Sequence, residues 1–218
     1  MLANLLDTII VYAVPMVLAI TLHEVAHGWV AYQCGDPTAH RMGRLTLNPL
    51  AHVDPVGTLM VPGGLVLMSA LTGGGMIPIF GWAKPVPVNT GYFRTHYRGK
   101  MIATALAGPA SNLLQAIIWL FILKALWDLG YQDALVGDVA KAGISVNLML
   151  MAFNLIPLPP LDGGVIVHHL LPWQLAQPYS KLYEYGQWIV IVLIMTGLTR
   201  YLVTPFLMFG QWLLTLLI

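Results

Sequence analysis

Charged side chains are scarce in this sequence. Only 9% of its 218 residues are Asp, Glu, Lys or Arg, whereas 58% are hydrophobic. With a mean hydropathy of +0.75, such a chain cannot cover a water-soluble globule with polar surface. Its net charge of +1 supplies no long-range attraction for nucleic acid. The composition therefore predicts an integral membrane protein, and it gives no support for a nucleic-acid partner.

Cysteine is almost absent as well, because Cys34 is the only one in the chain. A single cysteine excludes an internal disulfide, and it cannot form a cysteine-based zinc cluster by itself. Any metal ion must then be bound by His, Asp or Glu. The sequence also lacks internal repeats and low-complexity tracts.

Long apolar segments account for most of the sequence. A transmembrane helix needs about 20 apolar residues, so the chain has room for five or six crossings and no sizeable soluble domain. We predict an all-α polytopic membrane protein in which residues 1–218 form a single domain. The expected spans are residues 5–30, 101–126, 142–156, 183–198 and 201–218.

Residues 56–80 are apolar but are interrupted by Pro62-Gly63-Gly64 and by three successive glycines from Gly73. These residues weaken a continuous helix, so we expect a re-entrant segment that enters and leaves on one face. The prolines spaced through Trp82 to Asn89 favour extended backbone, which predicts a short extended piece there. An unwound substrate could pair with it, or with the loop from Arg41 to Pro55, by strand addition.

The first apolar segment ends in the pattern His-Glu-x-x-His, formed by His23, Glu24 and His27. On a helix the two imidazoles lie four residues apart on one face, so both can bind one metal ion beside Glu24. Ionisable groups at the end of a membrane span are costly unless they have a function. We interpret the pattern as that of a zinc hydrolase.

A catalytic zinc usually has three protein ligands, with the fourth position left to water. Asp162 is the best candidate for the third ligand, because it follows a proline-broken helix end and precedes two glycines that permit close backbone approach. Asp36, Asp54 and Glu184 remain alternatives.

Two further groups of polar residues, His52 with Asp54 and His168 with His169, lie among turn residues without the helical i, i+4 spacing. We expect no second metal site from either.

Three motifs in this order resemble the site-2 protease family of intramembrane zinc metalloproteases. They are His23-Glu24-x-x-His27, Gly108-Pro109 with Asn112, and Asn154-x-x-Pro157-x-x-Pro160-Leu161-Asp162-Gly163. The resemblance covers about residues 5–170, the catalytic core of that family, and is strongest to the short prokaryotic members without a PDZ domain. The two C-terminal helices expected over residues 183–218 match no diagnostic motif.

The resemblance implies one Zn²⁺ per chain, bound by His23, His27 and Asp162, with Glu24 as general base. It implies hydrolysis of a peptide bond within or near a transmembrane segment of a membrane-protein substrate, as in regulated intramembrane proteolysis. The expected partners are that segment and the lipid bilayer, and the expected location is the plasma (inner) membrane of a prokaryote. The oligomeric state has no signature in the sequence.

An oxyanion formed during hydrolysis needs a donor, and an uncharged amide can supply one. Asn154 is the first candidate for this donor and Asn112 the second. For each, the alternative role is an interhelical hydrogen bond that only stabilises the bundle.

Two other functions remain open from the residues alone. Intramembrane His and Asp also mark metal-ion transporters, and a relative without protease activity could bind membrane proteins. His27 and Asp162 can share one metal ion only if they lie at the same end of their helices. The helices that end near these two residues must therefore run in the same direction. The excess of Lys and Arg at that face predicts that the site is towards the cytoplasmic side.

Overall fold

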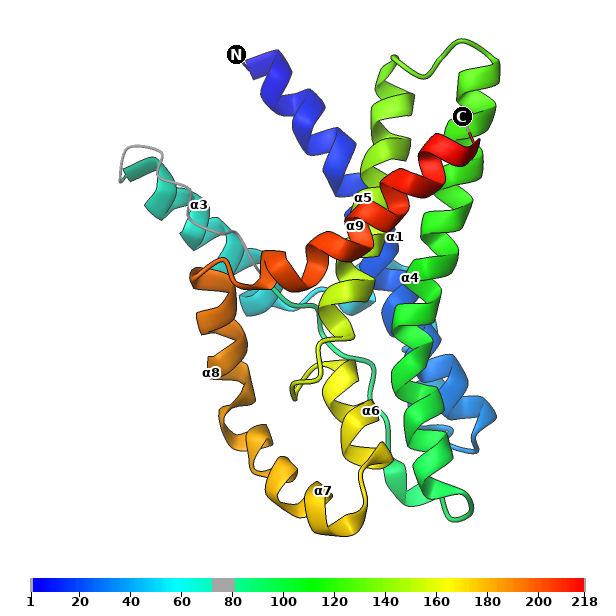
Figure 1. Cartoon of the computed structure of the whole chain (residues 1–218), viewed down its shortest axis with the longest axis vertical. Helices are drawn as coiled ribbons and strands as arrows, with labels where there is room; N and C mark the ends of the chain where they lie inside the picture. The colour runs from blue at the N-terminus through cyan, green and yellow to red at the C-terminus, as the bar shows by residue number, and fades with distance from the viewer. Residues whose placement is uncertain (1, 72–80, 218) are drawn as a thin grey trace.

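The computed structural model describes residues 2–71 and 81–217, and these residues form helices and turns without any β-strand (Figure 1). The short turns are two 3₁₀-turns, η1 (Pro49–His52) and η3 (Thr90–Tyr92), and one π-helical turn, η2 (Pro55–Met60). The α-helices are α1 (Leu2–Gln33), α2 (Thr38–Arg41), α3 (Val61–Leu71), α4 (Tyr97–Asp128), α5 (Leu135–Asn154), α6 (Asp162–Leu170), α7 (Trp173–Ser180), α8 (Leu182–Met195) and α9 (Thr199–Leu217). The all-α prediction is confirmed.

Helices α1, α4 and α5 form the central bundle. Within it, α1 and α5 run in the same direction and α4 runs in the opposite one, as the requirement that His27 and Asp162 meet predicts (Figure 1). All three are long and apolar enough to cross a membrane, over Ile10–Gln33, Tyr97–Asp128 and Leu135–Asn154. The apolar core lies mainly between α4 and α5 and consists of Ala116, Leu120, Leu123, Ala140, Ile144, Leu148 and Met151.

The number of spans is lower than the predicted five or six. Besides the three bundle helices, the described residues contain one helix pair, α8 and α9, which passes the same test only when taken together and is bent by 72°. Gly197, at the break, has a φ of 71°, which glycine adopts without steric cost. The 14 residues of α8 extend only about 21 Å at 1.5 Å per residue, less than the roughly 30 Å of a hydrocarbon core.

Two further helices, α6 and α7, lie between the loop that follows α5 and the C-terminal helices. His168 and His169, which had suggested turn structure, lie in the last turn of α6. Helix α5 begins at Leu135, earlier than the start of the span expected over residues 142–156.

The two ends of the predicted re-entrant segment lie next to each other. The Trp82 amide donates to the Gly57 carbonyl at 3.1 Å, and the Thr58 hydroxyl donates to the Trp82 carbonyl at 2.8 Å. Gly57 and Trp82, near the two ends of the segment, therefore lie side by side, and the re-entrant path between them stays a prediction. Its second part, residues 72–80, lies outside the described residues.

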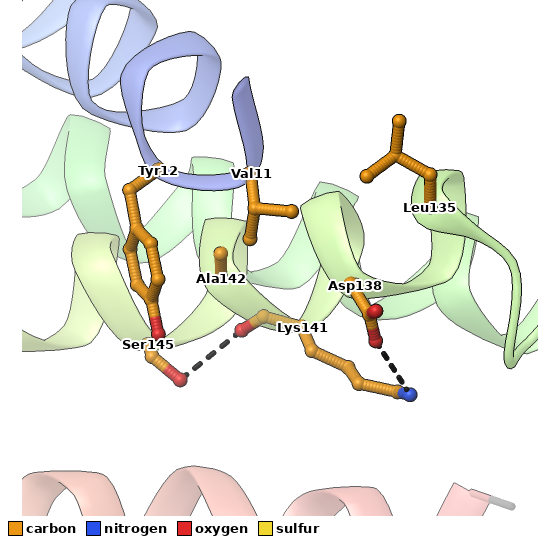
Figure 2. Close-up of a pocket in the computed structure, with 7 residues that line it drawn as sticks. All are labelled: Val11, Tyr12, Leu135, Asp138, Lys141, Ala142 and Ser145. Carbon is orange, nitrogen blue, oxygen red and sulfur yellow. Dashed lines mark hydrogen bonds and ion pairs between the residues drawn. The ribbon is translucent and has the colours of Figure 1, made fainter. Parts of the chain in front are cut away.

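The N-terminal half of α1 diverges from the bundle (Figure 1). A cavity of about 550 Å³ lies where it separates from α5, and Lys141 and Asp138 form an ion pair of 3.1 Å in its wall (Figure 2). The lining residues are Val11 and Tyr12 of α1 with Leu135, Asp138, Lys141, Ala142 and Ser145 of α5. The two helices are thus open at this end of the bundle.

Candidate active site

The histidines of α1 and the aspartate of α6 meet at one point. His23 Nε2 and His27 Nε2 are 3.0 Å apart, and Asp162 Oδ2 lies 3.3 Å from the first and 3.4 Å from the second. Within the described residues this is the one group of three His, Cys, Asp or Glu side chains arranged to hold a metal ion. The structure therefore brings together the three ligands predicted from the sequence.

Asp162 reaches this point because α6 begins tightly against the loop that follows α5. A Cβ atom on Gly163 would lie 2.5 Å from the Ile156 carbonyl oxygen, and one on Gly164 would lie 2.5 Å from the Leu158 carbonyl carbon. The two glycines thus allow the first turn of α6 to pack on backbone, and Asp162 is the first residue of that turn. The loop contains a cis peptide bond between Pro159 and Pro160.

Helix α4 contacts both histidines from the other side. His27 Nδ1 donates to the Thr104 carbonyl at 2.7 Å, and His23 Nδ1 donates to Asn112 Oδ1 at 2.6 Å. Because α4 runs antiparallel to α1, the later residue of α4 meets the earlier residue of α1. Between these contacts lies Gly108, where a Cβ atom would overlap His27 Nε2 and lie 2.6 Å from His23 Nε2.

These hydrogen bonds determine which imidazole nitrogen faces the metal site. Both Nδ1 atoms form hydrogen bonds to oxygens that can only accept, so each Nδ1 carries the proton. Each neutral imidazole therefore has its lone pair on Nε2. Asp162 Oδ2 is buried and has no hydrogen-bond donor in the described part of the chain. Three acceptor atoms this close repel one another unless a cation lies between them. Two imidazole nitrogens and one carboxylate oxygen are a ligand set that zinc favours.

Glu24 lies beside the ligands but is not one of them. Its Oε2 accepts a hydrogen bond of 2.8 Å from the Val86 amide, in the non-helical segment of residues 81–89. Side chains and backbone carbonyls both hold this segment: Arg44 Nη2 donates to the Lys84 carbonyl at 2.9 Å, the Asn89 amide donates to Asp36 at 2.6 Å, and the Lys84 amide donates to the His52 carbonyl at 2.9 Å. The predicted extended piece therefore contacts the candidate general base directly.

The two predicted oxyanion donors have different surroundings. Asn112 is fully buried, and its amide nitrogen donates to the Ala19 carbonyl at 3.3 Å and to Asn147 Oδ1 at 3.0 Å. Asn154 is half-buried, and its amide nitrogen donates to the Leu150 carbonyl of its own helix at 3.0 Å. The oxyanion role of either residue stays a prediction.

Sequence reasoning missed two contributors to the site, Thr104 and Asn147. Thr104 acts through its carbonyl, which carries no sequence signal. Asn147 could have been noticed, because an amide side chain within an apolar transmembrane helix needs a partner.

The alternative carboxylates lie elsewhere. Asp36 is buried and accepts hydrogen bonds from the Thr38 and Asn89 amides, and Asp54 caps the first turn of η2. Glu184 is exposed in the first turn of α8. None of the three joins the metal-binding group.

His52 and the α6 histidines also lie apart from the site. His52 Nε2 bonds to the Thr46 carbonyl at 3.0 Å, and the rings of His168 and His169 contact each other at 4.9 Å. Burial, with the nearby His169 and Arg98, lowers the pKa of His168.

A zinc-ligand triad with an adjacent carboxylate, built on a helix long enough to cross a membrane, defines a membrane-embedded zinc hydrolase. Residues 11–144 and 132–198 match the family described as Peptidase family M50. The chain belongs to this family, the site-2 proteases, and it is a zinc metalloprotease.

Named relatives agree with this assignment. YwhC of Bacillus subtilis, named as a candidate zinc metalloprotease, is 36% identical over 203 residues, which are 91% of this chain and 86% of YwhC. Rip2 of Mycolicibacterium smegmatis, named likewise, is 33% identical over 82% of this chain and 64% of Rip2. Rip2 of Mycobacterium tuberculosis is 31% identical over 71% of this chain and 55% of Rip2. No solved structure matches the chain.

Proposed function

We propose that this metalloprotease hydrolyses a peptide bond within or near a transmembrane segment of a membrane-protein substrate, as the catalytic component of regulated intramembrane proteolysis. One observation carries the proposal: His23 and His27 lie on α1, within Ile10–Gln33, which is itself a candidate membrane span. A metal site on a spanning helix is suited to substrates that reach it from the bilayer.

Glu24 is placed to move the proton of the reaction. When bound, zinc supplies Lewis-acid activation of water and of the scissile carbonyl. Glu24 would accept a proton from the attacking water and deliver it to the leaving amine, because it follows His23 in the sequence and lies outside the metal-binding group. Asn154 is our candidate for the amide that stabilises the developing oxyanion.

The substrate must be unwound locally, because the peptide bonds of a helix are hydrogen-bonded and shielded. We propose that residues 82–89 accept the unwound segment by strand addition. Two contacts support this: the Val86 amide reaches Glu24, and Arg44 fixes the carbonyls of Lys84 and Pro85 from one side. A substrate paired here would lie along the general base.

For the location, we propose the plasma membrane of a prokaryotic cell, with the active site towards the cytoplasm. The basic residues of the connection between α1 and α4 support this orientation through the positive-inside tendency. They are Arg41, Arg44, Lys84, Arg94 and, with the first turn of α4, Arg98 and Lys100.

The test is co-expression with tagged single-span membrane proteins, comparing the wild type with Glu24→Gln. We expect wild-type cells to accumulate a fragment whose new terminus maps by mass spectrometry to the transmembrane segment or its border, and Glu24→Gln cells to accumulate none. Cleavage confined to soluble domains, or equal cleavage by both proteins, would refute the proposal.

A further inference from the structure

An unbroken series of hydrogen bonds connects the zinc ligand His23 to the backbone of α5. Asn147 Nδ2 donates to the Gly143 carbonyl at 2.8 Å, and Asn112 Nδ2 donates to Asn147 Oδ1 at 3.0 Å. His23 Nδ1 then donates to Asn112 Oδ1 at 2.6 Å. Asn112 and Asn147 both have an exposed fraction of 0%, so no solvent competes for these bonds.

This series has a direction. A side-chain amide has a donor end and an acceptor end, and a half-turn exchanges them. The Gly143 carbonyl can only accept, so it fixes the donor end of Asn147 and turns its oxygen towards Asn112. Asn112 must then present its own nitrogen to Asn147, which leaves its oxygen facing His23.

We propose that Asn147 is a positioning residue for the metal site, which acts through Asn112 to hold His23 in the tautomer whose Nε2 lone pair faces the metal. Both ends of the Asn112 amide are engaged in this task, which favours orientation of His23 over oxyanion binding as its role. The proposal rests on the zinc site of the family but not on the identity of the substrate.

Loss of Asn147 leaves only the Ala19 carbonyl, at 3.3 Å, to orient Asn112. In the flipped state the Asn112 nitrogen would face His23 Nδ1. His23 Nδ1 would then have to accept the hydrogen bond. Its proton would move to His23 Nε2, where it would block coordination of the metal. Because partners that orient a ligating histidine are typically worth 10–100-fold in metal affinity, we expect Asn147→Leu to weaken zinc binding by about tenfold or more.

The decisive measurement is zinc affinity in detergent, by competition with a chromophoric chelator, together with thermal unfolding of the metal-free protein. In Asn112→Asp/Asn147→Leu the residue 112 carboxylate accepts at both oxygens, so it has no orientation to lose. This double variant should bind zinc within a few-fold of wild type, although Asn147→Leu alone does not. Asn147→Asp, which still accepts from Asn112, should also remain within a few-fold.

Gln115→Leu is the matched control, because Gln115 is a buried amide of α4 that donates to the Ser111 hydroxyl of the same helix at 3.3 Å. It should leave zinc affinity unchanged. If Asn147→Leu does not fold, Asn147→Ala carries the same expectation, with and without Asn112→Asp. Wild-type affinity in the Asn147 single variants, or a double variant no better than the single one, would overturn the proposal and leave Asn147 as a packing residue.

Discussion

Gly108 shows how closely the backbone of α4 approaches the metal ligands. A methyl group on this residue would overlap His27 Nε2 and lie 2.6 Å from His23 Nε2. We therefore expect Gly108→Ala to push the histidines apart, at a cost of about 1–3 kcal/mol for an overpacked site. Metal analysis of the purified protein should find less than half of the wild-type zinc.

Gly99 provides the control for this substitution. It lies on the same helix, and nothing lies within 4 Å of a Cβ atom placed there. Gly99→Ala should keep full zinc content and, because alanine favours the helix, should unfold at the wild-type temperature or slightly above it. Equal zinc loss in both variants would point to damage of the helix rather than of the site.

The ligands and the general base should separate by their effects on zinc. His23→Ala, His27→Ala and Asp162→Ala each remove a ligand atom and should lose bound zinc. Glu24→Gln should retain zinc while turnover falls below detection, because it removes only the proton acceptor. Metal analysis and a cleavage assay on the same preparations distinguish the two classes, and full zinc in Asp162→Ala would assign the third ligand to another residue.

At the residue scale, the sequence predicted the atoms that bind metal better than the atoms that orient them. His23 and His27 are found from spacing, and Asp162 from its glycines and the family motif. Thr104 contributes a carbonyl that any residue would offer, so no reading of side chains could identify it. The hydrogen bond between Asn112 and Asn147 depends on how α4 is rotated about its axis relative to α5, which cannot be predicted from the sequence.

Among the structural elements, the segment of residues 81–89 is linked to catalysis through one backbone amide. Val86 donates to Glu24 Oε2, and proline at this position would remove that donor. Because a hydrogen bond to a charged group contributes about 1.5–3 kcal/mol, we expect Val86→Pro to lower kcat by roughly 10–100-fold with zinc content unchanged. Steady-state kinetics on a quenched peptide or a membrane substrate would measure this.

Val88→Pro is the comparison for that variant, since no hydrogen bond of the Val88 amide is found among the described residues. It should reduce kcat much less than Val86→Pro. If the two prolines were equally harmful, rigidity of the segment, rather than the contact with Glu24, would explain the loss.

At the element scale, hydropathy located apolar helices but not their bends. The bundle helices could be predicted because each is a long, continuous apolar segment. Hydropathy predicts two C-terminal spans, because it counts apolar residues and does not register the 72° bend between α8 and α9 at Gly197. Likewise, α6 could not be predicted, because glycines and histidines are typical of turns. Here the glycines instead allow the helix to pack closely on backbone.

For the whole molecule, the proposed orientation can be tested with cysteine labelling. Cys34 is partly exposed, so we use a Cys34→Ser background with single cysteines at Lys84 and Asp133. Lys84 precedes α4 (Tyr97–Asp128) in the sequence, and Asp133 follows it. A membrane-impermeant maleimide should label Lys84→Cys only from the cytoplasm and Asp133→Cys only from outside. The reverse pattern would show that the proposed topology is inverted. If both cysteines were labelled from the same side of the membrane, α4 would not be a span.

The antiparallel contact of α1 with α4 also limits how this family can change in length. The Thr104 carbonyl must face His27 while the Asn112 side chain faces His23. The number of residues between the two contacts is therefore fixed on both helices. One residue inserted between 104 and 112 would rotate the rest of α4 by about 100° and detach Asn112, although the segment would stay as apolar as before. Insertions and deletions accumulated during evolution should therefore avoid residues 23–27 and 104–112 and gather in the connections and at the outer ends of the helices.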